Sequence, residues 1–321
     1  MAQDASASAP AVLIAGAGAI GSFYGAVLAH QGCTVDVISR SDHDIVSSRG
    51  IAIDSASLGD LSFTPRRTWR SAAECQSPPD YLLVCTKVLG SLDPVEMIRP
   101  AVGPHTVIVL IQNGVEIEPP YARAFPENEL ISALAFVAVS RTAPGEVRHK
   151  AYGQLVLGDF PSGLSDAVRH LAGLFESGGI NCTLSEDVVT ARWEKCVWNA
   201  AFNPASVAGG GLDTAAMLAT AEGENTIRRA MLEVCDTAAA CGHPQRDGLI
   251  DDHIAGTRRM PAYKTSMALD FERGREMEVE AILGNVVRAA RRGQVAAPTL
   301  ETLYGLLNMI VAAGDDNAGS G

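Results

Sequence analysis

A lysine and two asparagines recur at intervals of four residues in the second half of the chain. Lys195, Asn199 and Asn203 are spaced i, i+4, i+8, which places one ammonium and two amides along one stripe of a helix. Asparagine is a poor helix former, so its alignment with a lysine indicates a role. A solvated polar face is the alternative, but the neighbouring Trp193 and Val197 disfavour full exposure. The stripe is therefore a candidate functional site whose ammonium and amides can form hydrogen bonds.

A glycine-rich turn near the N-terminus is the second candidate site. An apolar run at 12–15, typical of a buried strand, is followed by the register G-x-G-x-x-G and then by a helical pattern. The first glycine allows a tight turn, the second lets a pyrophosphate approach the backbone, and the third lets helix and strand pack closely. The helix N-terminus adds N–H groups and a positive dipole end. A turn without ligand is the alternative, but the strand at 34–38 behind the helix favours a dinucleotide site made of Gly16, Ala17, Gly18, Ala19, Ile20 and Gly21.

Two residues after the second strand predict which dinucleotide binds. An NAD site usually has an acidic residue here, to hold the ribose 2′-hydroxyl. This chain has Ser39 and Arg40 instead, a hydroxyl and a guanidinium that suit a 2′-phosphate. A solvated loop arginine is the alternative. The pattern favours NADP(H) as the cofactor.

Polar residues also follow two further buried strands. Lys87 ends the run 81–87, and Asn113 follows the run 106–111. Ligands of open α/β sheets bind outside the carboxyl ends of the strands, so both residues are candidates for the site. The alternatives are a surface lysine and simple Asn-Gly turn chemistry.

The periodicities predict the elements that position these residues. Further strands are expected at 50–53, 61–63, 130–139, 153–158 and 180–184, with a helix at 165–178. After Asp187 nearly every segment is helical in pattern, including a long helix at about 214–241 and a final one at 300–311. The fold class is therefore α/β, a Rossmann-type and mainly parallel sheet domain at 11–187 followed by an all-helical domain at 188–313. Residues 1–10 and 314–321 are expected to be a disordered leader and tail.

Composition narrows the classes of partner. The chain has 321 residues, 47% of them hydrophobic, and a net charge of −12. An acidic chain without a basic stripe argues against nucleic acid as the main partner, and no apolar run approaches a membrane span. The cysteines number seven, form no C-x-x-C pair and favour a reduced, cytoplasmic protein with no metal site.

These residues together resemble the ketopantoate reductase (2-dehydropantoate 2-reductase) family. Besides the glycine turn, the matching features are Thr86-Lys87, Gln112-Asn113-Gly114, the Lys195/Asn199/Asn203-Pro204 helix, and Ser266-Met267-x-x-Asp270 with Glu278 twelve positions after Ser266. The resemblance spans about Val12 to Leu307.

The resemblance implies an NADP-dependent enzyme that reduces 2-dehydropantoate to (R)-pantoate, a step toward pantothenate and coenzyme A. It makes Lys195 the proton donor to the keto oxygen and Glu278 an essential carboxylate near the lysine and the cofactor. It makes Asn199, Asn203 and Ser266 substrate-binding, and Asn113 a contact of both substrate and cofactor. The partner is a small 2-keto acid, and a homodimer is one possible oligomeric state.

Three departures from the family pattern keep other substrates open. Tyr263 stands where many members have asparagine, and 209–213 and 139–141 also differ. The alternatives are a reductase of another branched 2-keto acid and a non-catalytic NADP(H)-sensing protein. A sensor needs no proton donor, so the retained Lys195 and Glu278 disfavour it.

Overall fold

The computed structural model describes residues 9–318, with side chains to residue 314. The expected leader lies largely outside the described residues. The chain divides into two compact units, and neither is continuous in sequence. The first consists of Met1–Lys87, Leu92–Gln112 and Glu118–Val188, and the second of Val88–Ser91, Asn113–Ile117 and Val189–Gly321. Two short segments that follow strands of the first unit therefore belong to the second.

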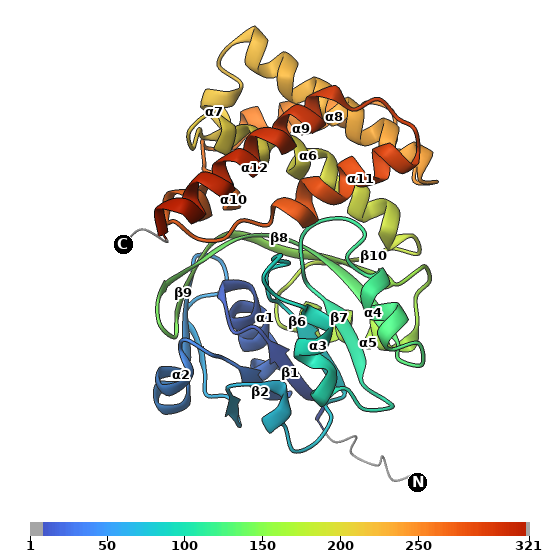
Figure 1. Ribbon diagram of the computed structural model, residues 1–321. Coiled ribbons are helices and arrows are strands. Elements are labelled where there is room, and N and C mark those ends of the chain that lie inside the picture. The colour runs from blue at the N-terminus through green and yellow to red at the C-terminus, as the bar shows by residue number, and fades with distance from the viewer. Residues whose placement is uncertain (1–8, 319–321) are drawn as a thin grey trace. The chain divides into compact units, whose positions relative to one another are not determined.

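The first unit is built on one sheet that is ten-stranded within the described residues, in the order β4-β3-β9-β8-β7-β6-β1-β2-β5 with β10 beside β9 (Figure 1). The central pairs are parallel, whereas β8 pairs with β9, and β3 with β4, in antiparallel fashion. The strands are β1 (Ala11–Ala15), β2 (Thr34–Ile38), β3 (Ile51–Ser55), β4 (Leu61–Phe63), β5 (Thr68–Trp69), β6 (Tyr81–Val84), β7 (Val107–Leu110), β8 (Leu130–Ala143), β9 (Glu146–Asp159) and β10 (Cys182–Leu184).

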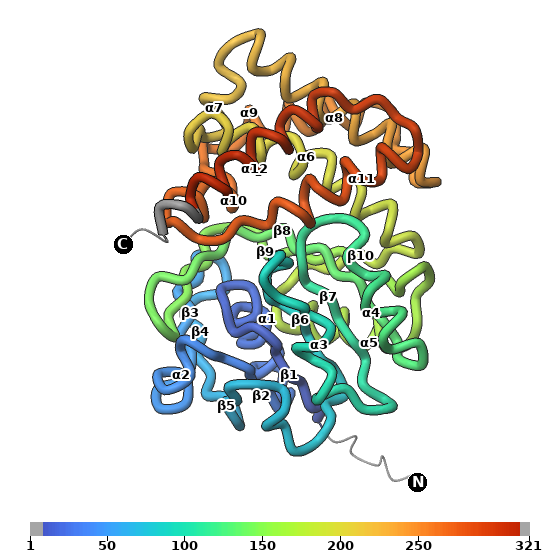
Figure 2. Tube along the Cα trace, in the orientation of Figure 1, coloured from blue at the N-terminus to red at the C-terminus, as the bar shows by residue number. Residues whose placement is uncertain are grey.

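Helices pack on this sheet through buried apolar side chains. Phe23 and Val27 of α1 lie in one core with Val12 and Ile14 of β1, all at most 1% exposed. Figure 2 traces the connections between strands and helices, with β5 next to β2. The helices of this unit are α1 (Ala19–His30), α2 (His43–Arg49), η1 (Ala72–Glu74), α3 (Pro94–Ile98), η2 (Arg99–Ala101), α4 (Pro119–Ala124) and α5 (Asp166–Ser177).

The second unit is helical and has its own core. Trp193, Val197 and Ala201 of α6 are buried there, together with Val115 from the inserted segment 113–117. The helices are α6 (Val188–Ala208), α7 (Thr214–Met217), α8 (Ala221–Ala240), α9 (Leu249–Arg259), α10 (Ser266–Glu272), the π-helical turn η3 (Glu280–Gly284), α11 (Asn285–Arg292) and α12 (Pro298–Ala318). The predicted fold class, a Rossmann-type sheet followed by a helical region, is confirmed.

Some expected bounds were wrong. The single helix at 214–241 is two helices, because Thr220 caps a new N-terminus by accepting a hydrogen bond from the Gly223 amide. The expected tail from residue 314 is helical as far as Ala318, while 319–321 lie outside the described residues. None of the helices described is both long and apolar enough to span a membrane.

Candidate active site

Lys195 meets one of the other predicted site residues directly. Its Nζ donates a hydrogen bond to Oδ1 of Asn113 over 3.0 Å. Lys195 lies in the third turn of α6, and Asn113 opens the segment 113–117 that the second unit takes from the N-terminal half of the chain. Two residues 82 positions apart in sequence are thus brought together within one unit.

The environment of the lysine favours proton transfer near neutral pH. The pKa of Lys195 is lowered from its ordinary value to about 7, first by burial and second by the positive charge of Arg192. The carboxylate of Glu278 and the thiol of Cys196 act in the opposite direction and raise the pKa. A lysine whose pKa lies near the working pH can both hold and release a proton.

Glu278 is a buried carboxylate, 7% exposed, that touches the other inserted segment. Its Oε1 accepts a hydrogen bond from the Val88 amide over 3.1 Å. Val88 follows Lys87 directly, and Lys87 itself is partly exposed after the end of β6. Glu278 therefore raises the pKa of Lys195 and also forms a hydrogen bond with the segment 88–91.

Both polar atoms of the Asn203 side chain form hydrogen bonds within the protein. It is 2% exposed, its Nδ2 donates to the Asn199 carbonyl over 3.1 Å, and its Oδ1 accepts from the Met267 amide over 3.3 Å. The first bond lies within α6, and the second joins α6 to the first turn of α10. Asn199 is partly exposed and Ser266 exposed. Substrate contact by all three remains a prediction, and the bracing bonds of Asn203 were not foreseen from its spacing.

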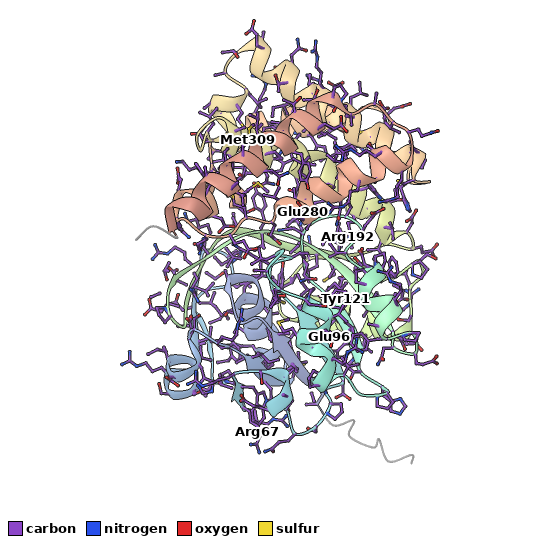
Figure 3. All side chains as sticks on the ribbon, in the orientation of Figure 1. Arg67, Glu96, Tyr121, Arg192, Glu280 and Met309 are labelled. Carbon is purple, nitrogen blue, oxygen red and sulfur yellow. The ribbon has the colours of Figure 1, made fainter. Side chains whose placement is uncertain are left out.

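Sequence reasoning missed Arg192. This residue, labelled in Figure 3, is 3% exposed, and its Nη1 donates to the Gly114 carbonyl over 3.0 Å. It precedes Lys195 by three positions, so the i, i+3 rule already placed both cations on one side of the helix. The signal was there, but an arginine in a helix is usually a surface residue.

The glycine turn has the shape that a dinucleotide needs. A Cβ on Gly21 would lie 2.3 Å from the Gly16 carbonyl oxygen. Gly16 itself has φ +100°, and a Cβ there would lie 2.8 Å from Cγ2 of Thr86. These two glycines are required by packing. At Gly18, which precedes the first residue of α1, a Cβ would meet nothing within 4 Å. The open space lies where a bound phosphate would approach the helix N-terminus, so the turn fits a dinucleotide.

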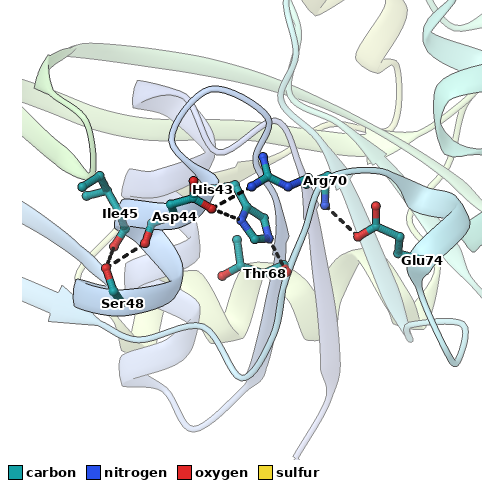
Figure 4. Close-up of polar contacts among 7 residues, drawn as sticks. All are labelled: His43, Asp44, Ile45, Ser48, Thr68, Arg70 and Glu74. Atoms are coloured by element: carbon teal, nitrogen blue, oxygen red, sulfur yellow. Dashed lines mark hydrogen bonds and ion pairs between the residues drawn. The ribbon is translucent and has the colours of Figure 1, made fainter.

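Arg40 is not the only arginine at the carboxyl end of β2. The Ser39 amide donates to the Trp69 carbonyl over 2.9 Å, which sets the end of β5 beside the end of β2. Arg70 follows β5 and pairs with Asp44 over 2.7 Å, and Asp44 also lies 2.9 Å from the His43 ring (Figure 4). Arg40 is exposed and Ser39 buried. Because Asp44 already engages the Arg70 guanidinium, Arg40 is the arginine at this edge that suits an anionic ligand group.

Among the described residues, no group of three or more histidine, cysteine or acidic side chains could hold a metal ion. The described cysteines are all free.

Comparison with known proteins places the chain in one family. The family model described as "Ketopantoate reductase PanE/ApbA" matches residues 12–162, and the model "Ketopantoate reductase PanE/ApbA C terminal" matches residues 187–311. A protein of Nostoc named 2-dehydropantoate 2-reductase is 29% identical over 302 residues, covering 92% of this chain and 94% of the relative.

Solved structures agree with this assignment. The crystal structure of 2-dehydropantoate 2-reductase from Methylococcus capsulatus is 52% identical, with a TM-score of 0.90 over 95% of this chain and 97% of that one. A D-mandelate dehydrogenase solved with NADH shares the fold, with a TM-score of 0.87 at 19% identity and coverage of 95% and 99%. With both family models matched across most of its length, the chain belongs to the ketopantoate reductase family.

Proposed function

We propose that this protein reduces 2-dehydropantoate to (R)-pantoate with NADPH, as a cytoplasmic step toward pantothenate and coenzyme A. The family membership supports an oxidoreductase that uses a nicotinamide dinucleotide. The observation that carries the finer proposal is the partly exposed lysine with a pKa of about 7, hydrogen-bonded to Asn113. The proposal involves no nucleic acid or membrane, and solution measurements would test for a homodimer.

The residues of the lysine site account for the proton. NADPH held by the glycine turn would supply the hydride to the ketone carbon. Lys195 donates a hydrogen bond to the keto oxygen, stabilises the negative charge that builds there and then transfers its proton to give the hydroxyl. Asn113 orients the ammonium through its Oδ1. Glu278 favours the charged form of Lys195 before the transfer, since its carboxylate raises the pKa of the lysine.

The preference for NADPH over NADH rests on the end of β2. Arg40 is exposed there, Arg70 follows the adjacent strand, and no acidic residue takes the position after Ile38. A 2′-phosphate would gain charge-assisted hydrogen bonds from a guanidinium at this edge, whereas a 2′-hydroxyl would not.

A second substrate class is favoured by one observation. Tyr263, three residues before Ser266, is 40% exposed and stacks on Trp198 with 6.1 Å between ring centroids. Trp198 in turn stacks on Phe202 over 4.6 Å, and both belong to the helix that carries Lys195. A wall of aromatic rings near this stripe would suit another branched 2-keto acid with an apolar side chain. A sensor without turnover is disfavoured by the tuned lysine.

One assay separates these functions. NADPH oxidation is followed with 2-dehydropantoate and, in parallel, with a panel of branched and aryl 2-keto acids at matched concentrations. The proposal expects the highest kcat/KM with 2-dehydropantoate, and the alternative expects it with an apolar 2-keto acid. Binding of NADPH without oxidation in the presence of any of these acids would leave the sensor as the function.

A further inference from the structure

A buried cation lies beside the candidate proton donor. Arg192 precedes Lys195 by one turn of α6 and is 3% exposed. Burying a charged group costs free energy unless hydrogen bonds compensate, and a like charge nearby adds to that cost. We therefore expect the buried arginine to have a structural or functional role in this helix.

The two cations hold successive residues of one segment. Arg192 Nη1 donates to the Gly114 carbonyl over 3.0 Å, and Lys195 Nζ donates to the Asn113 side chain over 3.0 Å. Because Asn113 and Gly114 are adjacent, any displacement of the Gly114 carbonyl moves the partner of the lysine.

The segment 113–117 also contacts η3 and α11. Gly114 has φ +98°, and a Cβ there would lie 2.3 Å from the Ala281 carbonyl oxygen. The Val115 amide donates to that same oxygen over 3.2 Å, and Asn285 Nδ2 donates to the Val115 carbonyl over 2.7 Å. The turn η3 and helix α11 thus hold one edge of the segment, and Arg192 holds the edge that faces α6.

We propose that Arg192 is a positioning residue for the proton donor, which anchors Gly114 so that Asn113 stays within reach of Lys195 and which keeps a second positive charge beside the ammonium. The proposal deepens the proposed function and rests on it for the role of Lys195. The charged and titratable groups that act on this lysine are Arg192, Glu278 and Cys196. Arg192 is the one that favours release of the proton, because its charge lowers the pKa of Lys195.

Two substitutions separate charge from anchoring. Arg192→Gln keeps a hydrogen-bond donor and loses the charge, whereas Arg192→Lys keeps the charge and loses the planar fork. Arg228→Gln, at a partly exposed arginine of α8 that pairs with Glu224 and Asp251, is the matched control for loss of an arginine in the same unit.

The first readout needs neither substrate nor cofactor. The full-length protein is labelled with trace acetic anhydride across a pH series, and acetylation of Lys195 is measured by mass spectrometry with Lys150 as the internal reference. The midpoint for Lys195 is expected to rise by about one pH unit in Arg192→Gln. It is expected to stay at the wild-type value in Arg192→Lys and Arg228→Gln.

The second readout is steady-state kinetics of NADPH oxidation. Arg192→Lys is expected to lower kcat about tenfold with little change in KM for NADPH, because a loosened Asn113 misplaces the donor. This arm decides the matter if Arg192→Gln does not fold. An unmoved Lys195 midpoint in folded Arg192→Gln, or an unchanged kcat in Arg192→Lys, would overturn the proposal. Absence of turnover in wild-type protein would contradict the proposed function and leave the labelling result standing.

Discussion

At the scale of single residues, the neighbours of Lys195 have opposite effects on its pKa, so its titration is the most informative property. Burial and Arg192 lower its pKa to about 7, while Glu278 raises it. A proton donor must be charged before the reaction, so kcat/KM is expected to be highest below this pKa and to fall as the pH rises through about 7.

Removing the carboxylate tests this balance. Glu278→Gln keeps the shape of the side chain but removes the charge that raises the pKa of Lys195, so the basic limb of the pH profile of kcat/KM is expected to move to lower pH. Glu301→Gln, at a surface carboxylate of α12 paired with Arg291, is the control. A limb that stays in place, or moves to higher pH, would show that Glu278 does not act on the ionisation of the lysine.

The preference for NADPH over NADH is also expected to depend on a single residue. Arg40→Asp replaces an exposed guanidinium with a charge that repels a 2′-phosphate, so the KM for NADPH should rise at least tenfold while that for NADH stays nearly constant. Arg169→Asp, on the exposed side of α5, controls for the change in net charge. Equal losses with both cofactors would mean that Arg40 has a structural role.

At this scale the spacing of side chains predicted much, but not everything. It placed Lys195 on a stripe and identified Asn113 at a strand end, because such positions follow from helical periodicity and from where parallel strands stop. It could not predict that the two side chains meet, or that both polar atoms of Asn203 are engaged by backbone groups. Partners distant in sequence are set by tertiary packing, which a local pattern does not contain.

Among the elements, the turn from β1 into α1 separates packing from binding. Gly18→Val puts a side chain into space where a Cβ meets nothing within 4 Å, so the fold should survive while NADPH binding is lost. Gly21→Ala is the matched contrast. Its Cβ would lie 2.3 Å from the Gly16 carbonyl oxygen, so thermal stability should fall. Binding and melting temperature are measured on both proteins, and a Gly18→Val protein that still binds NADPH at wild-type affinity would remove this turn from the site.

Element bounds were predicted well where periodicity was long and poorly where a cap interrupted it. The strand at 34–38 was predicted to the residue, whereas the helix expected at 214–241 is broken at Thr220. The hydroxyl of Thr220 accepts a hydrogen bond from a backbone amide at the N-terminus of the new helix. Such a local hydrogen bond competes with continuation of the preceding helix, and apolar periodicity does not record it.

At the scale of the whole molecule, the two units are not contiguous in sequence. The sequence was expected to divide once, near Asp187, because composition and periodicity describe contiguous stretches. Segments 88–91 and 113–117 nevertheless belong to the second unit, and Val115 is fully buried in its core. The helical unit therefore depends on residues from the N-terminal half.

Val115→Ala tests that dependence. Removal of two methyl groups from a buried site should destabilise the second unit by about 2 kcal/mol, since the cavity adds to the lost transfer free energy. Hydrogen exchange should accelerate in α6 and α11 and stay constant in β1 and β6. Val109→Ala, fully buried in the core of the first unit, should give the reverse pattern. Faster exchange in β1 and β6 alone after Val115→Ala would contradict the assignment of this segment.

The central claim is that Lys195 gives the proton during NADPH-dependent reduction, and steady-state kinetics of Lys195→Ala test it most directly. The account predicts that kcat with the preferred 2-keto acid falls by a factor of about 10²–10⁴, the usual scale for a positioned general acid, while affinity for NADPH changes little. Lys150→Ala, at an exposed lysine of β9, should leave both parameters at their wild-type values. A Lys195→Ala enzyme with near wild-type kcat and a raised KM for the keto acid would contradict the claim, because that combination is the signature of lost uniform binding and would make Lys195 a clamp for the substrate carboxylate.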